Sequence, residues 1–449
     1  MHAVQRRRVV FVLAMLLLCA WLSLRTEPGA VLAGAPNPAV PQVNAAAFSG
    51  LGRLAFVQSG TLYALDGAAD TFTTLSGTGE EVARPSWSPD GEWVAYLDIA
   101  NRDAAVLHLV RADGSANHTI GGLPLPPGFL AFRWSPVADT LAISDGGLWL
   151  APADGAATLL VAGAVERADW SPNGTMIAYT TDGRRDPSGI EGIWTVAAAG
   201  GIPDLQYAVA HPLYNGVAEF GWAGNPPRLL FTLDPSHSAS LFADGGWLFS
   251  LAPGGDVFTP LARALFYDDW RSVSPDGRSL AIVAGGGREA YRGKQVAVCD
   301  LARGGCADLP APDGTLTLDP AWSPDGARLA EVQAPDLGPV GGFRNNAGRD
   351  AWLNAHTLVV VNADGTQPLQ LSPPGEAADS PQWSRDGATI LYLCGIARGV
   401  CIVPSDGSGA SMQVIDALSG PPGPFTPGPL GYYGHFDPAL VLAWWQPGG

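Results

Sequence analysis

One short stretch recurs seven times along this chain, and it constrains the fold more than any other feature. In its full form an aromatic residue is followed by Ser-Pro-Asp-Gly and an apolar run, as in Trp87-Ser88-Pro89-Asp90-Gly91. Ser-Pro-Asp-Gly favours a type I turn, because proline presets φ at the second position and glycine suits the fourth. The copies lie 36 to 61 residues apart, a period that is typical of a propeller or an array. They centre on Trp87, Trp134, Trp170, Trp222, Val273, Trp322 and Trp383.

Each repeat divides into four short strands. The strand with the aromatic residue comes first, and in the Trp170 repeat residues 175–180 and 193–197 supply the next two. A tight turn such as Asp154-Gly155 precedes the fourth strand in most copies, and Asp-Gly tolerates the positive φ that a two-residue hairpin requires. Four antiparallel strands per repeat make a propeller blade. The sequence therefore predicts an all-β propeller over residues 50–447, consistent with its 57 glycines and 39 prolines.

The two ends of the chain determine the number of blades. Residues 53–57, 61–65 and 72–75 form three predicted strands with no Trp strand before them, and Leu440 to Trp445 form one strand at the other end. Pairing the terminal strand with the first three would close the ring and remove the exposed edges of a linear array. We predict eight blades, with seven as the alternative if the degenerate unit around Trp222 is not a separate blade.

The first 25 residues have the layout of an export signal or a signal anchor. Arg6, Arg7 and Arg8 precede the apolar run Val9 to Leu24, and Arg25 ends it. Sixteen residues reach about 24 Å, somewhat less than a hydrocarbon core of ~30 Å, which favours a cleavable signal. The small residues at 33–35 lie far from the run for a cleavage site, so a membrane anchor stays open.

Location and partners follow from this layout. Residues 26–49, rich in Ala, Pro and Gly, are expected to form a tether. Everything after Arg25 is expected outside the cytoplasm, whether periplasmic, secreted or anchored facing outward. The net charge of −17 and the single lysine, Lys294, argue against a nucleic-acid partner.

Four cysteines form two copies of one pattern. Cys299 and Cys306, and likewise Cys394 and Cys401, flank an Arg-Gly turn. Folded as hairpins, these segments place each pair at a separation that a disulfide can bridge, and an exported chain meets oxidising conditions. We predict two disulfides; free thiols and a four-cysteine metal site are the alternatives.

Motifs for catalysis and cofactors are absent from the sequence. It has no Gly-x-Ser-x-Gly elbow, no Gly-x-x-x-x-Gly-Lys loop and no His-Glu-x-x-His helix, and its seven histidines are scattered. We therefore predict no cofactor, no metal and no catalytic residue.

The Trp-Ser-Pro-Asp-Gly turn, the apolar strand after it and the later Asp-Gly turn resemble the WD-repeat-like blades of the TolB-type propellers. Such blades occur in periplasmic TolB and in front of the hydrolase domain of prolyl oligopeptidase-like peptidases. The resemblance covers residues 50–447 and implies a fold rather than a function, since the family includes scaffolds, receptors and accessory domains. This chain departs from the family in having only a tether before the blades, where TolB has an α/β domain, and no hydrolase domain after them.

Loop lengths predict the working face. Links between second and third strands emerge on the same side as the links between blades, and long loops on a rigid scaffold are common binding sites. The long segments on this side are 182–192, 234–246, 285–294, 334–356 and the blade link 419–438. The side chains that we expect to contact a partner are Arg184, Arg185, Arg288, Tyr291, Arg292, Phe343, Arg344, Arg349, Trp352, Tyr432 and Tyr433. The alternative is that these loops are tolerated surface insertions.

Two functions are compatible with this pattern. The first is a non-catalytic propeller in the cell envelope that binds a protein, peptide or glycan through the long-loop face. The second is an envelope hydrolase or lyase acting on a polymer, with a site at the central channel. Convergent carboxylates or histidines in the channel would favour the enzyme, whereas an apolar or plugged channel would favour the binding protein.

Overall fold

The computed structural model describes residues 40–101, 104–120, 131–209, 216–234, 244–339, 341–420 and 433–448. The predicted export segment, residues 1–25, lies outside this part of the chain. The compact unit begins at Pro41, and Phe48 is fully buried. The folded part therefore starts earlier than the predicted boundary at residue 50, and the end of the predicted tether packs on the propeller. In the described part, no helix is long and apolar enough to cross a membrane.

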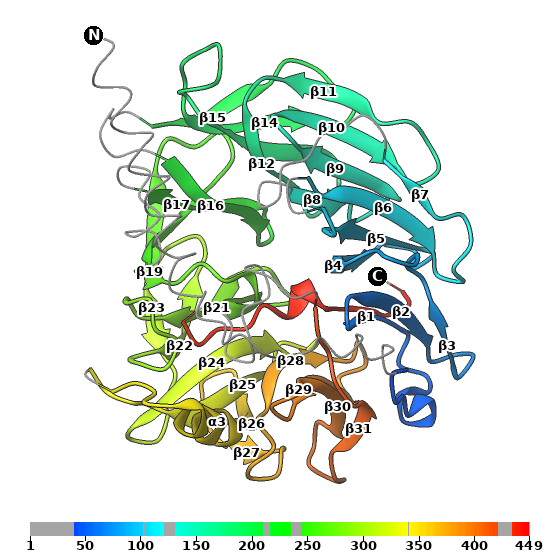
Figure 1. The fold of residues 1–449 in the computed structure, drawn as a ribbon. Helices are drawn as coiled ribbons and strands as arrows, with labels where there is room; N and C mark the ends of the chain where they lie inside the picture. Colours follow the sequence, from blue (N-terminus) through cyan, green and yellow to red (C-terminus); the bar gives the residue numbers. More distant parts are fainter. Residues whose placement is uncertain are drawn as a thin grey trace, which may run out of the picture. The chain divides into compact units, whose positions relative to one another are not determined.

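The chain is an all-β propeller, as predicted (Figure 1). Six of its sheets are four-stranded and antiparallel. The closing sheet contains β32 (Leu442–Trp445), β1 (Arg53–Gln58), β2 (Thr61–Asp66) and β3 (Thr71–Thr74). Next come β4 (Val82–Trp87), β5 (Trp93–Asp98), β6 (Val106–Arg111) and β7 (His118–Thr119). They are followed by β8 (Ala131–Trp134), β9 (Thr140–Ser144), β10 (Gly147–Pro152) and β11 (Thr158–Ala162).

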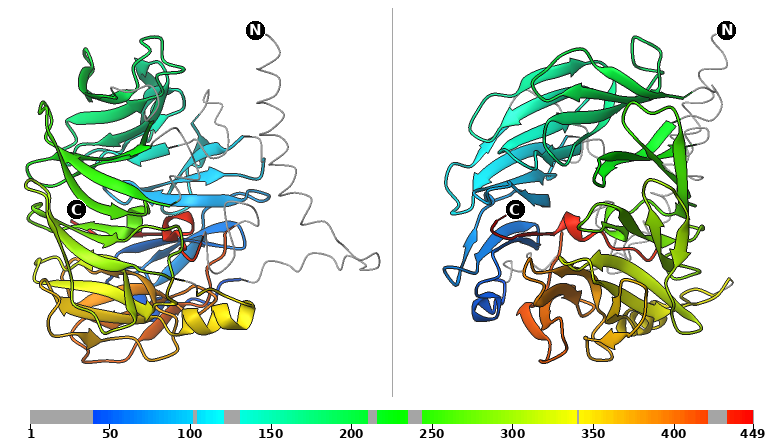
Figure 2. Two further views of the ribbon diagram at one scale, coloured as in Figure 1. Left: turned by 90° about the vertical axis from the view of Figure 1, so that its left-hand side faces the viewer. Right: turned by 180° about the vertical axis from the view of Figure 1, so that it is seen from behind.

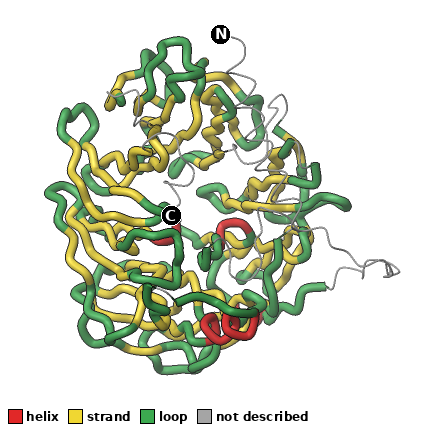
Figure 3. The backbone as a smooth tube through the Cα atoms, turned by 60° about the vertical axis from the view of Figure 1, so that its left-hand side comes forward, coloured by secondary structure: helices red, strands yellow, loops and turns green. Residues whose placement is uncertain are grey.

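The remaining sheets continue in chain order. One contains β12 (Val165–Trp170), β13 (Met176–Thr181), β14 (Gly192–Ala197) and β15 (Asp204–Ala208). Another contains β24 (Thr315–Trp322), β25 (Arg328–Pro335), β26 (Thr357–Asn362) and β27 (Leu369–Gln370). The last contains β28 (Asp379–Trp383), β29 (Thr389–Cys394), β30 (Gly399–Pro404) and β31 (Met412–Ile415). The helical elements are η1 (Ala45–Phe48), η3 (Asp268–Trp270), α3 (Asn346–Asn354) and η4 (Pro438–Leu440), a small share of the described chain (Figure 3).

One sheet has eight strands, twice as many as each of the others. The number of blades therefore stays a prediction. It contains β16 (Gly216–Ala223), β17 (Arg228–Asp234), β18 (Gly246–Leu251) and β19 (Phe258–Ala264). It also contains β20 (Arg271–Val273), β21 (Ser279–Ala284), β22 (Gln295–Asp300) and β23 (Cys306–Asp308). A single register pair, Ala264 with Ala284, joins β19 to β21. We interpret this sheet as two blades in edge contact, which gives eight.

The C-terminal strand closes the ring, which confirms the predicted pairing. β32 lies antiparallel to β1, with Arg53 opposite Trp445 and Phe56 opposite Leu442. The red C-terminal segment reaches the blue β1–β2 hairpin in Figure 1 and in the right-hand view of Figure 2. The strand begins at Leu442 rather than at the predicted Leu440, because η4 occupies the preceding residues.

The repeated tryptophan joins neighbouring sheets. The indole Nε1 of Trp134 donates to the carbonyl of Ser86 at 3.1 Å, and that of Trp87 donates to Ala443 at 3.1 Å. Trp170 and Trp383 donate in the same way to Arg133 and Ala321. Each acceptor stands immediately before the aromatic residue of the preceding sheet. The repeat is therefore a device for sheet-to-sheet packing, which explains why it recurs without carrying chemistry.

Candidate functional site: the inner cluster and the strap

Three sheets carry a strained residue at the same point of their first strand. Arg84, Asp319 and Ser380 have φ of 55°, 51° and 49°, and each is followed by proline and stands three residues before the repeat Trp. The strand register shifts at all three positions. Positive φ is costly for residues other than glycine and concentrates at functional sites, and a bulge re-aims a side chain. These bulges mark the part of the molecule where buried charges gather.

We call that gathering the inner cluster; it consists of Asp269, Asp319, His356, Asp379, Arg398 and His435. Its carboxyl groups come from different sheets and lie close together. The carboxyl of Asp319 hydrogen-bonds that of Asp379 and accepts from the backbone N–H of Ser380 at 3.1 Å. The guanidinium of Arg398 forms an ion pair with Asp379. Arg398 itself has a φ of 55°. The cluster therefore joins the β24–β27 and β28–β31 sheets through charge-assisted hydrogen bonds.

Burial sets the protonation states of the cluster. Burial and the nearby Asp379 charge raise the pKa of Asp319 well above its ordinary value. Burial also opposes ionisation of Asp379, but the Arg398 charge and the hydrogen bond with Asp319 outweigh it and hold the pKa of Asp379 below its ordinary value. Burial lowers the pKa of His356 to about 4. The environment therefore shifts the pKa values of the two aspartates in opposite directions, and His356 is uncharged at neutral pH.

The C-terminal link covers this cluster. We call residues 433–441 the strap; in Figure 1 they form the red segment that crosses the middle of the ring. At one end the backbone N–H of Ala290 donates to the carbonyl of Tyr433 at 2.9 Å. At the other end the backbone N–H of Val57 donates to Val441 at 2.8 Å. Between them Asp437 pairs with Arg84 at 3.4 Å. The strap thus connects the β21–β22 loop with β4 and β1.

His435 is the central contact of the strap. Its Nε2 lies 2.8 and 2.9 Å from the two carboxylate oxygens of Asp269, so this nitrogen donates. Its ring stacks on Tyr267 with centroids 3.6 Å apart and planes 4° apart. The ring of Trp270 meets it edge-on at 5.4 Å. His435 is only 7 % exposed, so the strap inserts a buried side chain into the inner cluster.

Six of the side chains predicted to bind a partner meet beside the strap. We call them the loop cluster: Arg288, Tyr291, Arg292, Phe343, Trp352 and Tyr433. Tyr291 contacts Phe343 with ring centroids 4.7 Å apart, and Phe343 contacts Trp352 at 5.6 Å. The guanidinium of Arg288 lies 5.5 Å from the ring of Tyr433. Three segments far apart in the sequence, residues 285–294, 336–356 and the strap, therefore form one surface.

Some of these residues support the loops rather than present a surface. Trp352 is 4 % exposed, and its Nε1 donates to the carbonyl of Pro335 at 2.9 Å. Lys294, the only lysine, is buried and donates to the carbonyls of Gly286, Gly287 and Arg292 at 3.0 to 3.1 Å. Burial lowers the pKa of Lys294 to about 8. An ammonium with three carbonyl partners is fully hydrogen-bonded, so it organises the 285–294 loop.

The other predicted binding residues are not members of the loop cluster. Arg184 and Arg185 both pair with the buried carboxylate of Asp182, at 2.8 and 2.7 Å, on the β13–β14 loop. Arg349 pairs with Asp350 at 2.7 Å. Arg344 is exposed, and Tyr432 lies outside the described residues. Partner contact through any of these side chains stays a prediction.

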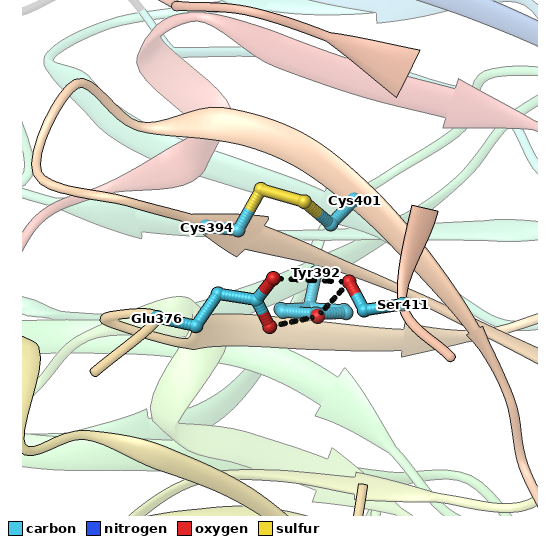
Figure 4. The surroundings of a disulfide bond; sticks show 5 residues. All are labelled: Glu376, Tyr392, Cys394, Cys401 and Ser411. Carbon is cyan, nitrogen blue, oxygen red and sulfur yellow. Dashed lines mark hydrogen bonds between the residues drawn. A yellow bond between two sulfur atoms is a disulfide. The ribbon is translucent and has the colours of Figure 1, made fainter. Parts of the chain in front are cut away.

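Both predicted disulfides are present. Cys299 bonds to Cys306 between β22 and β23, and Cys394 bonds to Cys401 between β29 and β30. Figure 4 shows the second bond beside Tyr392, whose hydroxyl donates to Glu376 at 2.5 Å. This disulfide closes the loop that carries Arg398, so it constrains a member of the inner cluster.

Elsewhere in the described chain we find no metal site and assign no ligand pocket. No group of three or more His, Cys, Asp or Glu side chains there could hold a metal ion. A pocket of about 230 Å³ lies between the closing sheet and the β4–β7 sheet, next to Arg53 and Arg111. Arg53 already pairs with Asp66 at 3.3 Å and Glu92 at 3.0 Å. Ligand pockets usually measure roughly 300–1,000 Å³, so we assign no site to this pocket.

Sequence reasoning missed the inner cluster and the strap's role. The sequence indicated only a long link at 419–438 and gave no role to the adjacent Asp268 and Asp269. The structure places both aspartates in η3, where Asp268 pairs with Arg133 at 3.0 Å. One available signal was the proline after each bulge residue, at Pro85, Pro320 and Pro381.

Known proteins resemble this chain only at low identity. No protein-family model and no curated protein matches this chain. A solved structure assigned to TolB of Agrobacterium tumefaciens shares 14 % identity over 82 % of this chain and 89 % of its own, with a TM-score of 0.36. TolB of Acinetobacter baumannii shares 17 % over 72 % and 64 %, with a TM-score of 0.36. A prolyl endopeptidase structure shares 14 % over 86 % of this chain and 50 % of its own, with a TM-score of 0.47. Likeness at this level transfers no activity, so the function rests on this chain's own geometry.

Proposed function

We propose that this protein is an extracytoplasmic, non-catalytic propeller that binds a protein, peptide or glycan through its long-loop face. The observation that carries the proposal is the convergence of the 285–294 loop, the 336–356 loop and the strap on one surface. Aromatic and arginine side chains are enriched where proteins bind each other, and this surface combines both. The rigid sheets beneath it supply a fixed platform.

An enzyme acting on a polymer is the second candidate, and the inner cluster is the reason to keep it. The cluster contains convergent carboxylates and imidazoles, the arrangement that we expected of a channel enzyme. Two carboxyl groups with separated pKa values, as in Asp319 and Asp379, are also typical of acid–base catalysis. However, a general acid or base must reach its substrate. Asp319 and Asp379 are at most 8 % exposed, and so is His435 on the strap, which favours a binding role.

The proposed location has separate support. Two disulfides on neighbouring strands are expected of a protein that matures under oxidising conditions. The arginine-flanked apolar run at the N-terminus is the other argument for export.

Capture from the native envelope tests the proposal. Arg344→Glu reverses one exposed charge on the long-loop face. Arg303→Glu is the matched control on the opposite face, because its side chain is 88 % exposed in the turn between β22 and β23. We expect Arg344→Glu to reduce capture of the partner about tenfold and Arg303→Glu to leave it unchanged. The opposite pattern would place the binding face on the short turns.

A further inference from the structure

The surroundings of His435 have the composition of a recognition site. Tyr267, Asp269 and Trp270, which we call the seat, lie within four consecutive residues before β20. They provide a stacked ring at 3.6 Å, two carboxylate oxygens at 2.8 and 2.9 Å, and a second ring at 5.4 Å. Aromatic faces beside a carboxylate are a common way to bind a flat group that carries N–H donors and positive charge. His435 fills the seat as such a group would.

The imidazole of His435, which fills the seat, belongs to the strap and not to a strand of the propeller. Strap contacts beside His435 include the Asp437–Arg84 pair, with side chains 34 % and 45 % exposed, and Phe436, whose ring lies 4.7 Å from the guanidinium of Arg398. Exposed ion pairs contribute little to stability. His435 is therefore a principal anchor of the middle of the strap.

The charges around the seat favour a cation. Burial raises the pKa of Asp269, the His435 contact acts against it, and the charges of Asp437 and Asp379 add to the rise. If His435 left without a replacement, Asp269, whose side chain is 19 % exposed, would lose the donor that now lies 2.8 and 2.9 Å from its two oxygens, which is costly. An incoming cation would remove that cost.

We propose that the seat is a binding site for a flat cationic side chain, an arginine or histidine of a peptide partner, and that His435 occupies it as an intramolecular ligand. This deepens the proposed binding function and rests on it for the partner. Arginine and histidine fit better than lysine, because only a planar group can stack on Tyr267 while its N–H groups reach Asp269. The chain's net charge of −17 would assist the approach of a basic peptide.

An internal ligand weakens every external one. The apparent dissociation constant of a competitor rises by the inverse of the fraction of molecules with an empty seat. A strap that occupies the seat nine-tenths of the time would weaken external binding about tenfold. Removal of the His435 ring should therefore expose a site that small cations can fill.

His435→Ala in the full chain tests the inference, with imidazole and methylguanidinium as probes. We expect both probes to raise the melting temperature of His435→Ala saturably, and to bind it at least about tenfold more tightly than they bind the parent. Methylammonium should bind more weakly, because it cannot stack. His118→Ala, which removes an imidazole from a different sheet, should show no gain.

Asp269→Asn added to His435→Ala identifies the site. The double variant should lose the saturable response, since the amide lacks the charge that holds the probe. An unchanged response in the double variant, or no response in folded His435→Ala, would overturn the inference. No envelope partner is involved, so a failed capture experiment would not affect this result.

Should His435→Ala not fold, a second pair of variants decides. His435→Arg should melt close to the parent, because a guanidinium can take the place of the imidazole in the seat. His435→Leu should melt well below it, since a leucine leaves Asp269 without a donor. Equal melting temperatures for the arginine and leucine variants would contradict the inference.

Discussion

Glu331 on β25 shows how burial alone can set the charge of a single residue in this propeller. The side chain is 1 % exposed. Gln333 donates to one carboxyl oxygen at 2.9 Å, and the other oxygen has no hydrogen-bond partner among the described residues. Burial raises the pKa of Glu331 to about 7 from an ordinary value of 4.5. The folded protein therefore holds a proton here that the unfolded chain releases.

This proton makes stability depend on pH. Because the pKa of Glu331 is higher in the folded state, this residue has no effect on the free energy of unfolding below pH 4.5. As the pH rises from there to about 7, it destabilises the folded state increasingly. The loss of unfolding free energy over that range is on the order of 3 kcal/mol. We predict that Glu331→Gln lacks this loss and becomes more stable than the parent at pH 8. Urea unfolding at pH 5 and pH 8 measures it, with exposed Asp308→Asn as the control; parallel pH profiles for parent and Glu331→Gln would contradict it.

The loop between β29 and β30 connects a covalent bond to the inner cluster. Cys394 and Cys401 close it, and Arg398 within it pairs with Asp379. The backbone N–H of Leu418 also bonds to the carbonyl of Arg398 at 3.1 Å, which connects this loop to the link that leads toward the strap. Opening of the loop should therefore loosen more than its own residues.

We predict that peptide mapping without reduction finds Cys299 linked to Cys306 and Cys394 linked to Cys401. Replacing either pair by alanine should cost about 2 kcal/mol, because both loops are short. Only the Cys394→Ala, Cys401→Ala variant should also speed hydrogen exchange in residues 433–441. If residues 433–441 exchanged at the same rate in both double variants, the Cys394–Cys401 bond would have no specific effect on the strap, and the prediction would be wrong.

Turns and strands that depend on residues close together in the sequence could be predicted, whereas the inner cluster could not. The Ser-Pro-Asp-Gly turn is local: the Ser88 hydroxyl accepts from the N–H of Trp93 at 3.0 Å and donates to Asp90 at 2.6 Å. The closing strand could be predicted because the first three strands lack a Trp strand before them and one strand remains at the C-terminal end. Asp269 and His435, in contrast, are separated by 166 residues and follow no period, so only the folded ring brings them together.

Closure of the ring is the property that the whole molecule depends on. β32 supplies the only partner of β1 other than β2 among the described strands. It also carries Trp444, whose Nε1 donates to the carbonyl of Leu51 at 2.6 Å, and Ala443, which accepts from Trp87. Loss of this strand would expose an edge and leave buried donors unpaired.

We predict that truncation after Val441 causes aggregation or a large fall in melting temperature. Replacing only the exposed Tyr433 by alanine is the matched control near the same end, and it should melt close to the parent. A truncated protein that melts like the parent would contradict closure by β32.

Hydrogen exchange of the full chain, alone and with its captured partner, tests the binding face most directly. If the long-loop face binds, the partner should slow exchange in residues 285–294 and 341–356, since these two loops contribute to one surface. The turns around residues 88–91 and 303–305 should exchange at unchanged rates. Protection confined to those turns, with the strap and long loops unaffected, would contradict the account.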